Sequence, residues 1–232
     1  MTRHLLSLLL LSLCLSATGA RAADVVDASV GEPVAATPAG SDPSRFFVRT
    51  GVASIMPSEG AVMKVGGAVV PGATISIDDH LTGLVEVGYR LNPNMSLAFT
   101  GGFPPDIDIN GAGTAAPFGR VGGILYGPTA LTLQYQVREW GWFQPYVGLG
   151  PMFMFVFDNK DGAMSGLDVD PAVGIAAQVG VDMMVNDRFG VFLDVKKARL
   201  RTSAKGSLGG APVEADVKLD PLVLSGGITF RF

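Results

Sequence analysis

His80, directly preceded by Asp78 and Asp79, is the strongest candidate for catalytic or metal chemistry in this sequence. Acyl transfer and lipid hydrolysis need a histidine beside a nucleophile, and His4 is the only other histidine in the chain. At the start of an expected strand, His80 is better explained as a rim histidine beside solvated carboxylates. We therefore expect no enzyme activity, no catalytic residue and no cofactor.

Two further motifs resemble ligand sites without meeting their requirements. The run Asp158-Asn159-Lys160-Asp161-Gly162 is similar to the start of a calcium loop, but Lys160 occupies a position where an oxygen ligand is needed. Gly148-Leu149-Gly150 is not followed by a helix pattern, so it is no nucleotide-binding motif. We expect neither a metal site nor a nucleotide site.

The N-terminal residues predict secretion. The basic start with Arg3, the apolar run 5–15 and the small residues that end at Ala22 are typical of a signal peptide over 1–22. The single cysteine, Cys14, lies within it, so the mature chain has no disulfide. Residues 23–44 are small and interrupted by prolines, which predicts a disordered periplasmic lead-in. Loss of Arg3 and Arg21 changes the formal charge from -4 to -6, and no basic tract suggests nucleic acid.

The composition is apolar, yet it disfavours helices. Hydrophobic residues make up 48% of the chain and charged residues 16%, while no apolar stretch after the signal reaches the ~18 residues of a membrane helix. The 31 glycines and 15 prolines further disfavour long helices. The apolar side chains must therefore be arranged by alternation along strands.

Period-two alternation begins near residue 45 and is clearest in the last strand. From Leu222 to Phe232, even-numbered residues are mostly apolar and odd-numbered residues mostly small or polar. Similar segments of membrane-crossing length lie at 46–56, 76–91, 95–104, 129–139, 144–157, 172–185, 189–202 and 214–232. They predict an all-β fold, an eight-stranded antiparallel transmembrane β-barrel over 45–232, in the outer membrane of a Gram-negative bacterium.

The connections between these segments alternate in length. Short inner turns are expected at 92–94, 139–142 and 186–188, and Trp140 and Trp142 suit an aromatic girdle at the inner interface. Long external loops are expected at 57–75, 105–128, 158–171 and 203–213. A soluble sandwich or lipocalin is the alternative, but it would hide its apolar faces behind a second layer or turn them inward.

Three segments resemble the OmpW family of small outer-membrane barrels. They are Gln144-Pro145-Tyr146-Val147-Gly148-Leu149-Gly150, then Ala177-Gln178-Val179-Gly180-Val181-Asp182, and Val217-Lys218-Leu219-Asp220-Pro221 with the strand that follows to Phe232. The resemblance implies an eight-stranded barrel with a hydrophobic lumen and a role in passing small apolar molecules inward. It also implies that Phe232 is an insertion signal read by the barrel-insertion machinery.

The even-numbered residues of the last strand are taken to face lipid. The same alternation then predicts which residues of every strand face the lumen. A charged plug is expected toward the periplasmic end, formed by Arg49, Glu86, Arg90, Arg138, Asp182 and Arg231. An apolar ligand-binding cup is expected above it, formed by Leu84, Met152, Met154, Val156, Phe192 and Leu200. The adaptable methionines suit ligands of varied shape, although these residues could equally serve only to fill the barrel.

These assignments leave two functions open. The first is a monomeric barrel forming a narrow hydrophobic channel for passive uptake of small apolar solutes. Because the plug closes the way through, we expect lateral release into the bilayer, where glycines and the strand residues Pro145, Pro151 and Pro221 weaken the ladders. The second is a structural or adhesive barrel that binds partners through its loops and transports nothing.

A basic set, Lys197, Arg199 and Arg201, faces outward at the external end of its expected strand. Two explanations remain. Asp216, Lys218 and Asp220 are expected on the neighbouring strand, where cross-strand ion pairs would account for the cations. Alternatively, these cations form a rim that faces lipopolysaccharide and binds its phosphates.

Overall fold

The computed structural model describes residues 45–232. The expected signal peptide, 1–22, and the expected lead-in, 23–44, lie outside the described residues. Within the described part of the chain, no helix is long and apolar enough to cross a bilayer. Its one helical element is a short 3-10 turn, η1 (Ala116–Phe118).

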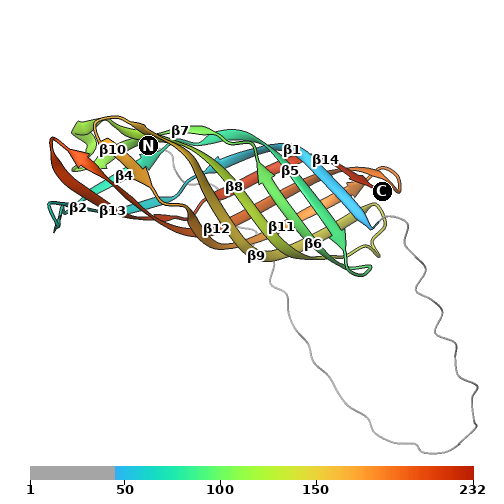
Figure 1. The fold of residues 1–232 in the computed structure, drawn as a ribbon. Coiled ribbons are helices and arrows are strands. Elements are labelled where there is room, and N and C mark those ends of the chain that lie inside the picture. Colours follow the sequence, from blue (N-terminus) through green and yellow to red (C-terminus); the bar gives the residue numbers. More distant parts are fainter. Residues whose placement is uncertain (1–44) are drawn as a thin grey trace, which may run out of the picture. The chain divides into compact units, whose positions relative to one another are not determined.

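Eight strands close into an antiparallel barrel, which confirms the expected all-β architecture (Figure 1). In order around the ring they are β1 (Phe46–Met56), β5 (His80–Arg90), β6 (Met95–Gly102), β8 (Arg120–Gln136), β9 (Phe143–Asp161), β11 (Ala172–Met184), β12 (Phe189–Leu208) and β14 (Leu222–Arg231). Each pairs with the next, and β14 pairs with β1 to close the ring.

The alternation follows the pleat, because successive side chains of a strand point to opposite faces. On β5, Val85, Val87 and Tyr89 are exposed on the outside, whereas Glu86 and Arg90 are buried inside. This is the inverse of a soluble barrel, and it suits a wall with lipid outside and polar groups inside.

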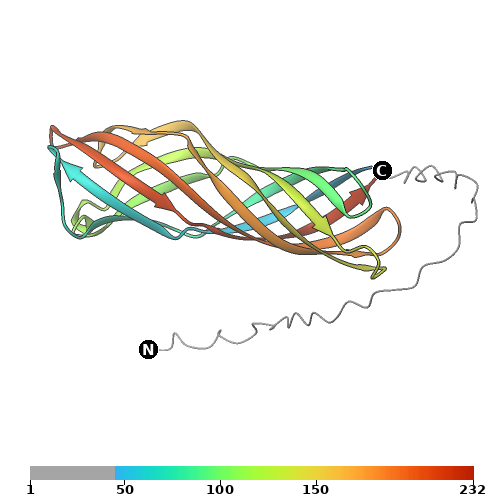
Figure 2. The same ribbon diagram turned by 90° about the horizontal axis from the view of Figure 1, so that it is seen from below.

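The four expected external loops are largely strands, so that prediction is wrong. They contain β2 (Glu59–Val65), β3 (Ala68–Val69), β4 (Ala73–Ile77), β7 (Asp106–Gly113), β10 (Ser165–Val169), β13 (Ala211–Leu219) and the ends of β8, β9 and β12. These segments continue the barrel beyond the membrane-length strands (Figure 2). Alternation also explains them: on β7, Ile107 and Ile109 are buried, while Asp106 and Asp108 are exposed.

The polarity of the wall reverses along the barrel. In the extension the outward residues are charged, as with Glu214, Asp216 and Lys218 on β13, and the inward residues are apolar, as with Val213 and Val217. Such a segment is arranged as a soluble β-structure, with water outside and an apolar core inside. The extension therefore projects from the lipid-facing part of the barrel.

The expected last strand, 214–232, is divided into β13 and β14 by Asp220 and Pro221. Proline has no N–H for the ladder, so pairing is interrupted there. The Pro221 carbonyl accepts from Ala198 N at 3.1 Å, and Asp220 N donates to the Ser58 carbonyl at 2.9 Å. These two bonds keep the halves aligned with β12 and the start of β2.

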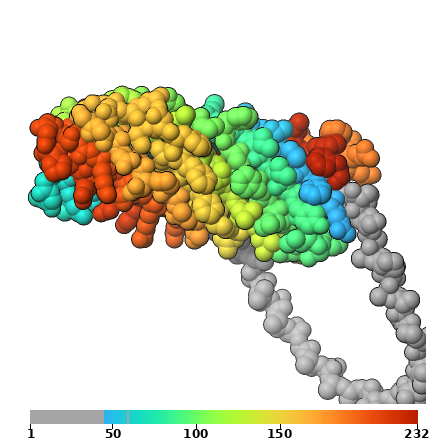
Figure 3. Space-filling view, viewed as in Figure 1, coloured from blue at the N-terminus to red at the C-terminus, as the bar shows by residue number. Residues whose placement is uncertain are grey.

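The first and last strands form the closing seam of the barrel, where the blue and red surfaces meet in Figure 3. Gly51 lies directly opposite Gly227, and a Cβ on Gly51 would overlap the backbone of β14. Glycine is needed at this contact because the two backbones approach closely. At the seam's inner end, Phe46 and Phe232 exchange backbone hydrogen bonds of 3.2 and 3.1 Å.

The inner turns are short, and two are closed by asparagine side chains. Asn92 Oδ1 accepts from the backbone N of Asn94 and Met95, and Asn186 Oδ1 accepts from the backbone N of Arg188 and Phe189. At the third turn Trp140 and Trp142 are exposed beside Phe143, where aromatic residues suit a membrane interface.

Candidate functional site

Arg49 on β1 organises a network of charged side chains inside the barrel. Its guanidinium donates to both carboxylate oxygens of Asp182, with Nε to Oδ1 at 2.9 Å and Nη2 to Oδ2 at 2.8 Å. Its Nη1 donates to Glu86 Oε1 at 2.5 Å. Arg231 Nη2 lies 3.1 Å from Asp182 Oδ2. The structure thus brings together four of the six residues expected to form the plug.

Neutral polar groups complete this network. Gln134 donates to Glu86 Oε1 at 3.1 Å, Gln136 donates to Asp182 Oδ2 at 2.7 Å, and Thr229 donates to Asp182 Oδ1 at 3.0 Å. Buried charges are tolerated when they are paired and hydrogen-bonded in this way. We call Arg49, Glu86, Gln134, Asp182 and Arg231 the charged floor.

The remaining two plug residues lie nearer the inner turns. Arg90 is the last residue of β5 and is buried, while Arg138 follows β8 and is partly buried. Both therefore lie at or just beyond the inner ends of their strands. Alternation along the sequence could not distinguish Arg90 and Arg138 from the residues of the charged floor. It predicts whether a side chain points inward, but not which residues of other strands lie near it.

An apolar cavity of about 100 Å³ lies above the charged floor. Four of the expected cup residues line it, namely Leu84, Met152, Met154 and Leu200. It is smaller than the ~150 Å³ cavity that holds benzene in an engineered protein. Methionine side chains adapt their shape readily, so Met152 and Met154 give this cavity room to adjust.

Val156 and Phe192 do not line this cavity, which corrects their placement in the cup. Phe192 packs against Ala53 and Leu84, which themselves line the cavity. Val156 packs against the apolar cluster of the extension, next to a register shift between β8 and β9. Val156 faces inward as expected, but it lies farther along the barrel than the cavity, and alternation along the sequence does not give that position.

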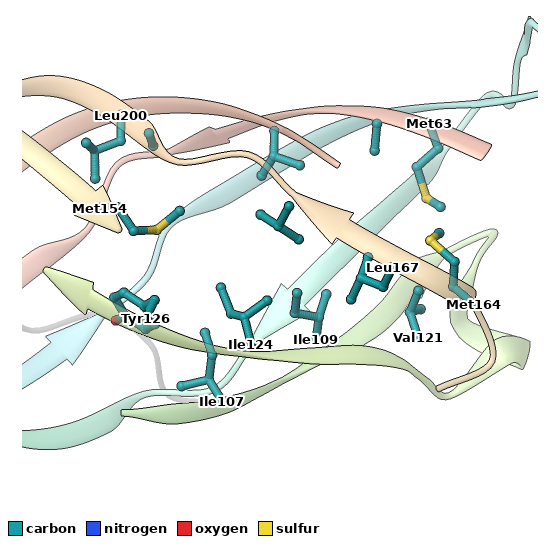
Figure 4. Close-up of a cluster of buried hydrophobic side chains, with 14 of the residues drawn as sticks. Met63, Ile107, Ile109, Val121, Ile124, Tyr126, Met154, Met164, Leu167 and Leu200 are labelled. Atoms are coloured by element: carbon teal, nitrogen blue, oxygen red, sulfur yellow. The ribbon is translucent and has the colours of Figure 1, made fainter. Parts of the chain in front are cut away.

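The extension carries a continuous apolar interior that the sequence reading assigned to loops. Figure 4 shows side chains from Met154 and Leu200 at one end to Met63 and Met164 at the other. A second cavity of about 50 Å³ lies within this cluster. Ile107 and Ile124, in the expected loop 105–128, line the first cavity. The alternation of Ile107 with Asp106 and Asp108 was a usable signal for a strand.

His80 follows the exposed Asp78 and Asp79, as expected, but it is partly buried and lines the first cavity. Its Nδ1 lies 3.0 Å from the Asp78 carbonyl oxygen, which can only accept. Nδ1 therefore carries a hydrogen, and Nε2 lies 2.8 Å from the Tyr126 hydroxyl oxygen. A side chain held by two hydrogen bonds has a structural explanation.

Lys196, on β12, is a cavity residue that the sequence reading missed. It is buried, and its Nζ lies 3.3 Å from Thr100 Oγ1 and 3.8 Å from Glu86 Oε2. It therefore stands where the charged floor meets the apolar cavity. Parity was a sufficient signal, because Lys196 shares the inward face of β12 with Phe192 and Leu200.

The expected basic rim does not lie at a strand end, because β12 continues to Leu208. Lys197, Arg199 and Arg201 are exposed, and they begin where the outward residues change from apolar Val191, Leu193 and Val195 to charged. The expected cross-strand pairs to β13 are not seen. Arg201 lies opposite Lys218, Asp216 pairs with Lys64 at 3.5 Å, and Lys197 Nζ contacts the backbone oxygen of Asp220.

The wall beside the cavity is interrupted between β8 and its neighbours β6 and β7. Pairing with β6 ends at Thr129 and pairing with β7 ends at Leu125. Between them, Pro128 has no N–H, and Tyr126 N makes one 3.3 Å bond to the Pro105 carbonyl. Gly102 and Pro128 both line the cavity here. By contrast, Pro145 pairs with β11 in register, and Pro151 interrupts only the β8 side of its strand.

Across residues 45–232, no group of three or more histidine, cysteine or acidic side chains is arranged to hold a metal ion.

Comparisons with known proteins agree with this architecture. The family model of the OmpW family matches residues 42–232. The Pseudomonas aeruginosa protein PahQ, described as a dibenzothiophene metabolism operon protein, is 32% identical over 197 residues, which cover 85% of this chain and 93% of PahQ. Outer membrane protein AlkL of Ectopseudomonas oleovorans is 32% identical over 170 residues, covering 73% of this chain and 74% of AlkL.

Solved structures share the fold. OprG from Pseudomonas aeruginosa superposes with a TM-score of 0.76 at 24% identity, covering 82% of this chain and 96% of OprG. AlkL in lipid bilayers superposes with a TM-score of 0.68 at 29% identity, covering 87% of this chain and 96% of AlkL. Both are outer-membrane barrels, and their ring of strands corresponds to the one described above. The chain therefore belongs to the OmpW family and is a transmembrane β-barrel of the bacterial outer membrane.

Proposed function

We propose that this barrel is a passive channel, without catalysis, that admits small apolar molecules from outside into the cavity above the charged floor. The observation that carries the proposal is an apolar cavity lined by Met152 and Met154 directly above a floor of ion-paired side chains. An apolar solute gains free energy by leaving water for such a cavity. It gains nothing by entering the floor, where it would separate buried charge pairs.

The name of one relative points to the same class of solute. PahQ is described as a dibenzothiophene metabolism operon protein, and dibenzothiophene is an apolar aromatic compound. A bacterium that grows on such compounds must move them across an outer membrane whose lipopolysaccharide leaflet resists apolar solutes. A barrel with an apolar cavity would supply that step.

We infer that solutes leave sideways into the bilayer and do not pass through the floor. The interruption beside Pro128 supports this route, because it borders the cavity and few backbone hydrogen bonds cross it. A Cβ on Gly102 would lie 2.9 Å from Pro128 Cγ, so the two residues face each other across the gap. Phe103, next to Gly102, is exposed on the outside, where the solute would meet lipid.

The channel is tested by introducing a charge into the cavity. We expect Met154→Arg to abolish uptake of a small apolar dye into vesicles whose outer leaflet is lipopolysaccharide, while Met154→Leu retains it. Ion conductance should stay low in both, because the charged floor is intact. Uptake by Met154→Arg equal to that of the unmodified protein would refute the channel and favour a structural barrel that transports nothing.

Three partner assignments accompany this proposal. Lys197, Arg199 and Arg201 would bind lipopolysaccharide phosphates, since they begin where the lipid-facing residues end. Phe232, exposed at the inner end of the seam, would be read by the barrel-insertion machinery. The barrel would act as a monomer, because its ring is closed without a second chain.

A further inference from the structure

The cavity is apolar along its walls, but one strong hydrogen-bond donor stands at its lower end. Lys196 lines the cavity, and its side chain is almost completely buried. An ammonium group has three N–H donors and no acceptor. The Lys196 Nζ atom lies 3.3 Å from Thr100 Oγ1 and 3.8 Å from Glu86 Oε2. The distance to Glu86 is too long for a hydrogen bond.

Glu86 depends little on Lys196, because other groups already bind it. Its Oε1 accepts from Arg49 Nη1 and Gln134 Nε2, and its Oε2 accepts from Thr100 Oγ1 at 2.6 Å. Lys196 therefore makes one hydrogen bond, to Thr100 Oγ1, and its ammonium group has further N–H donors. The geometry therefore offers a donor to whatever occupies the space above it.

The charge around Lys196 indicates which acceptor fits. Besides Arg90, which is the last residue of β5 near the inner turns, the buried charged residues are three cations and three acids, namely Arg49, Lys196, Arg231, Glu86, Asp182 and Asp194. Their formal charges cancel, so a bound anion would add an unbalanced buried charge, which is costly. A neutral acceptor adds none and still receives a charge-assisted hydrogen bond.

We propose that Lys196 is a specificity-determining residue, and that the cavity prefers apolar molecules with one neutral oxygen acceptor, such as an alcohol or a ketone, over bare hydrocarbons and carboxylates. This inference rests on the proposed channel and names its solute class. The apolar body contacts Met152, Met154 and Leu200, and the oxygen accepts from Lys196 Nζ at the lower end.

Three aromatic compounds of similar size test it, namely toluene, benzyl alcohol and benzoate. Binding is followed in lipid nanodiscs by NMR of 13C-methyl methionine, with Met152 and Met154 as reporters and Met95, at the inner end of β6, as a reference. The preference is the dissociation constant of toluene divided by that of benzyl alcohol, both corrected for partition into lipid. We expect this ratio to fall about tenfold in Lys196→Met, because benzyl alcohol then loses its hydrogen bond. Lys196→Arg should keep the preference, and toluene should bind all three proteins alike.

The outcomes separate this inference from the channel. If toluene binds and the ratio is unchanged in Lys196→Met, the role of Lys196 is wrong and the apolar channel stands. Tighter binding of benzoate than of benzyl alcohol would overturn the preference for a neutral acceptor. If none of the three compounds moves the Met152 or Met154 signals, the cavity is not a binding site, and both proposals fail.

Discussion

Arg49 of β1 and Asp182 of β11 form a two-point ion pair across the inside of the barrel, although their strands share no backbone hydrogen bond. Strand pairing fixes only neighbours around the ring. A bidentate pair across the lumen also fixes the distance between opposite walls, and Glu86 on β5 extends the connection to a third strand.

The first prediction concerns this pair. Arg49→Met should lower the free energy of unfolding by about 3–5 kcal/mol, because it leaves Asp182 and Glu86 as buried acids with one fewer cation. Urea unfolding of the barrel in lipid vesicles measures the change. Arg45→Met is the control: Arg45 is exposed one residue before β1, and its removal should have little effect. Equal effects of the two variants would contradict this view of the floor.

The second prediction concerns lateral release. A disulfide between Gly102→Cys and Pro128→Cys would join the two sides of the interruption, and no other cysteine lies within residues 45–232. We expect the oxidised double variant to lose uptake of an apolar dye and dithiothreitol to restore it. The single variants should transport in both states. Full uptake by the oxidised protein would place the exit elsewhere.

The third prediction concerns lipopolysaccharide. Reversing the charge in Arg199→Glu/Arg201→Glu should at least halve the lipopolysaccharide that co-purifies with the barrel, because phosphates then meet acids where they met guanidinium groups. Quantification of lipid A by mass spectrometry gives the measurement. Lys205→Glu, farther out on the same face of β12, reverses one cation outside this set and is a control that should retain the lipid. An unchanged amount in the double variant would leave these cations without a lipid partner.

The fourth prediction concerns Asp161 at the outer end of β9. Hydrogen bonds from the backbone N of Gly166 at 3.0 Å and of Leu167 at 2.9 Å hold the pKa of this carboxyl below its usual value. A lowered pKa means that the ionised form stabilises the hairpin. That contribution is complete above the unfolded pKa of about 3.9 and is lost as pH falls through the folded value.

Hydrogen exchange can follow this loss. The protection factors of the Gly166 and Leu167 amides should fall as the solution is acidified below about pH 4, with the acid form fully populated below the folded pKa. Asp161→Ala should show low protection at every pH. Asp158→Ala, at a nearby exposed carboxyl, should behave as the unmodified protein. A flat profile in the unmodified protein would show that the carboxylate does not hold this hairpin.

The ring of strands and the inward or outward face of most residues could be predicted from the sequence, because alternation is a local property. The inward positions of Arg49, Glu86 and Asp182 follow from parity alone. Which of them meet cannot be read this way, since contacts across the lumen depend on the stagger of the whole barrel. Val156 shows the same limit on a small scale, because it faces inward as parity predicts but lies beyond the cavity along the barrel.

The extension was missed for a different reason. Segments such as Asp106 to Asn110 alternate as clearly as the membrane strands, but their outward residues are charged, and they were assigned to the long connections between membrane-length segments. Where a strand passes from lipid into water, its residues still alternate with period two. The polar residues then lie on the outward face, and the apolar residues lie on the inward face. The period of two indicates a strand, whereas the polarity of the outward face indicates whether lipid or water surrounds it. These segments were assigned to loops because an apolar outward face was required of every strand.

The glycine pair at the closing seam has a consequence for how the molecule is made. Gly51 lies in the first ring strand and Gly227 in the last, so the contact between them joins opposite ends of the barrel sequence. A chain emerging from the ribosome cannot make this contact until β14 has been synthesised. Until then both edges of the nascent sheet are open to pairing with other chains. Closure of the barrel therefore depends on its final strand, and a chain without β14 would present two unpaired strand edges.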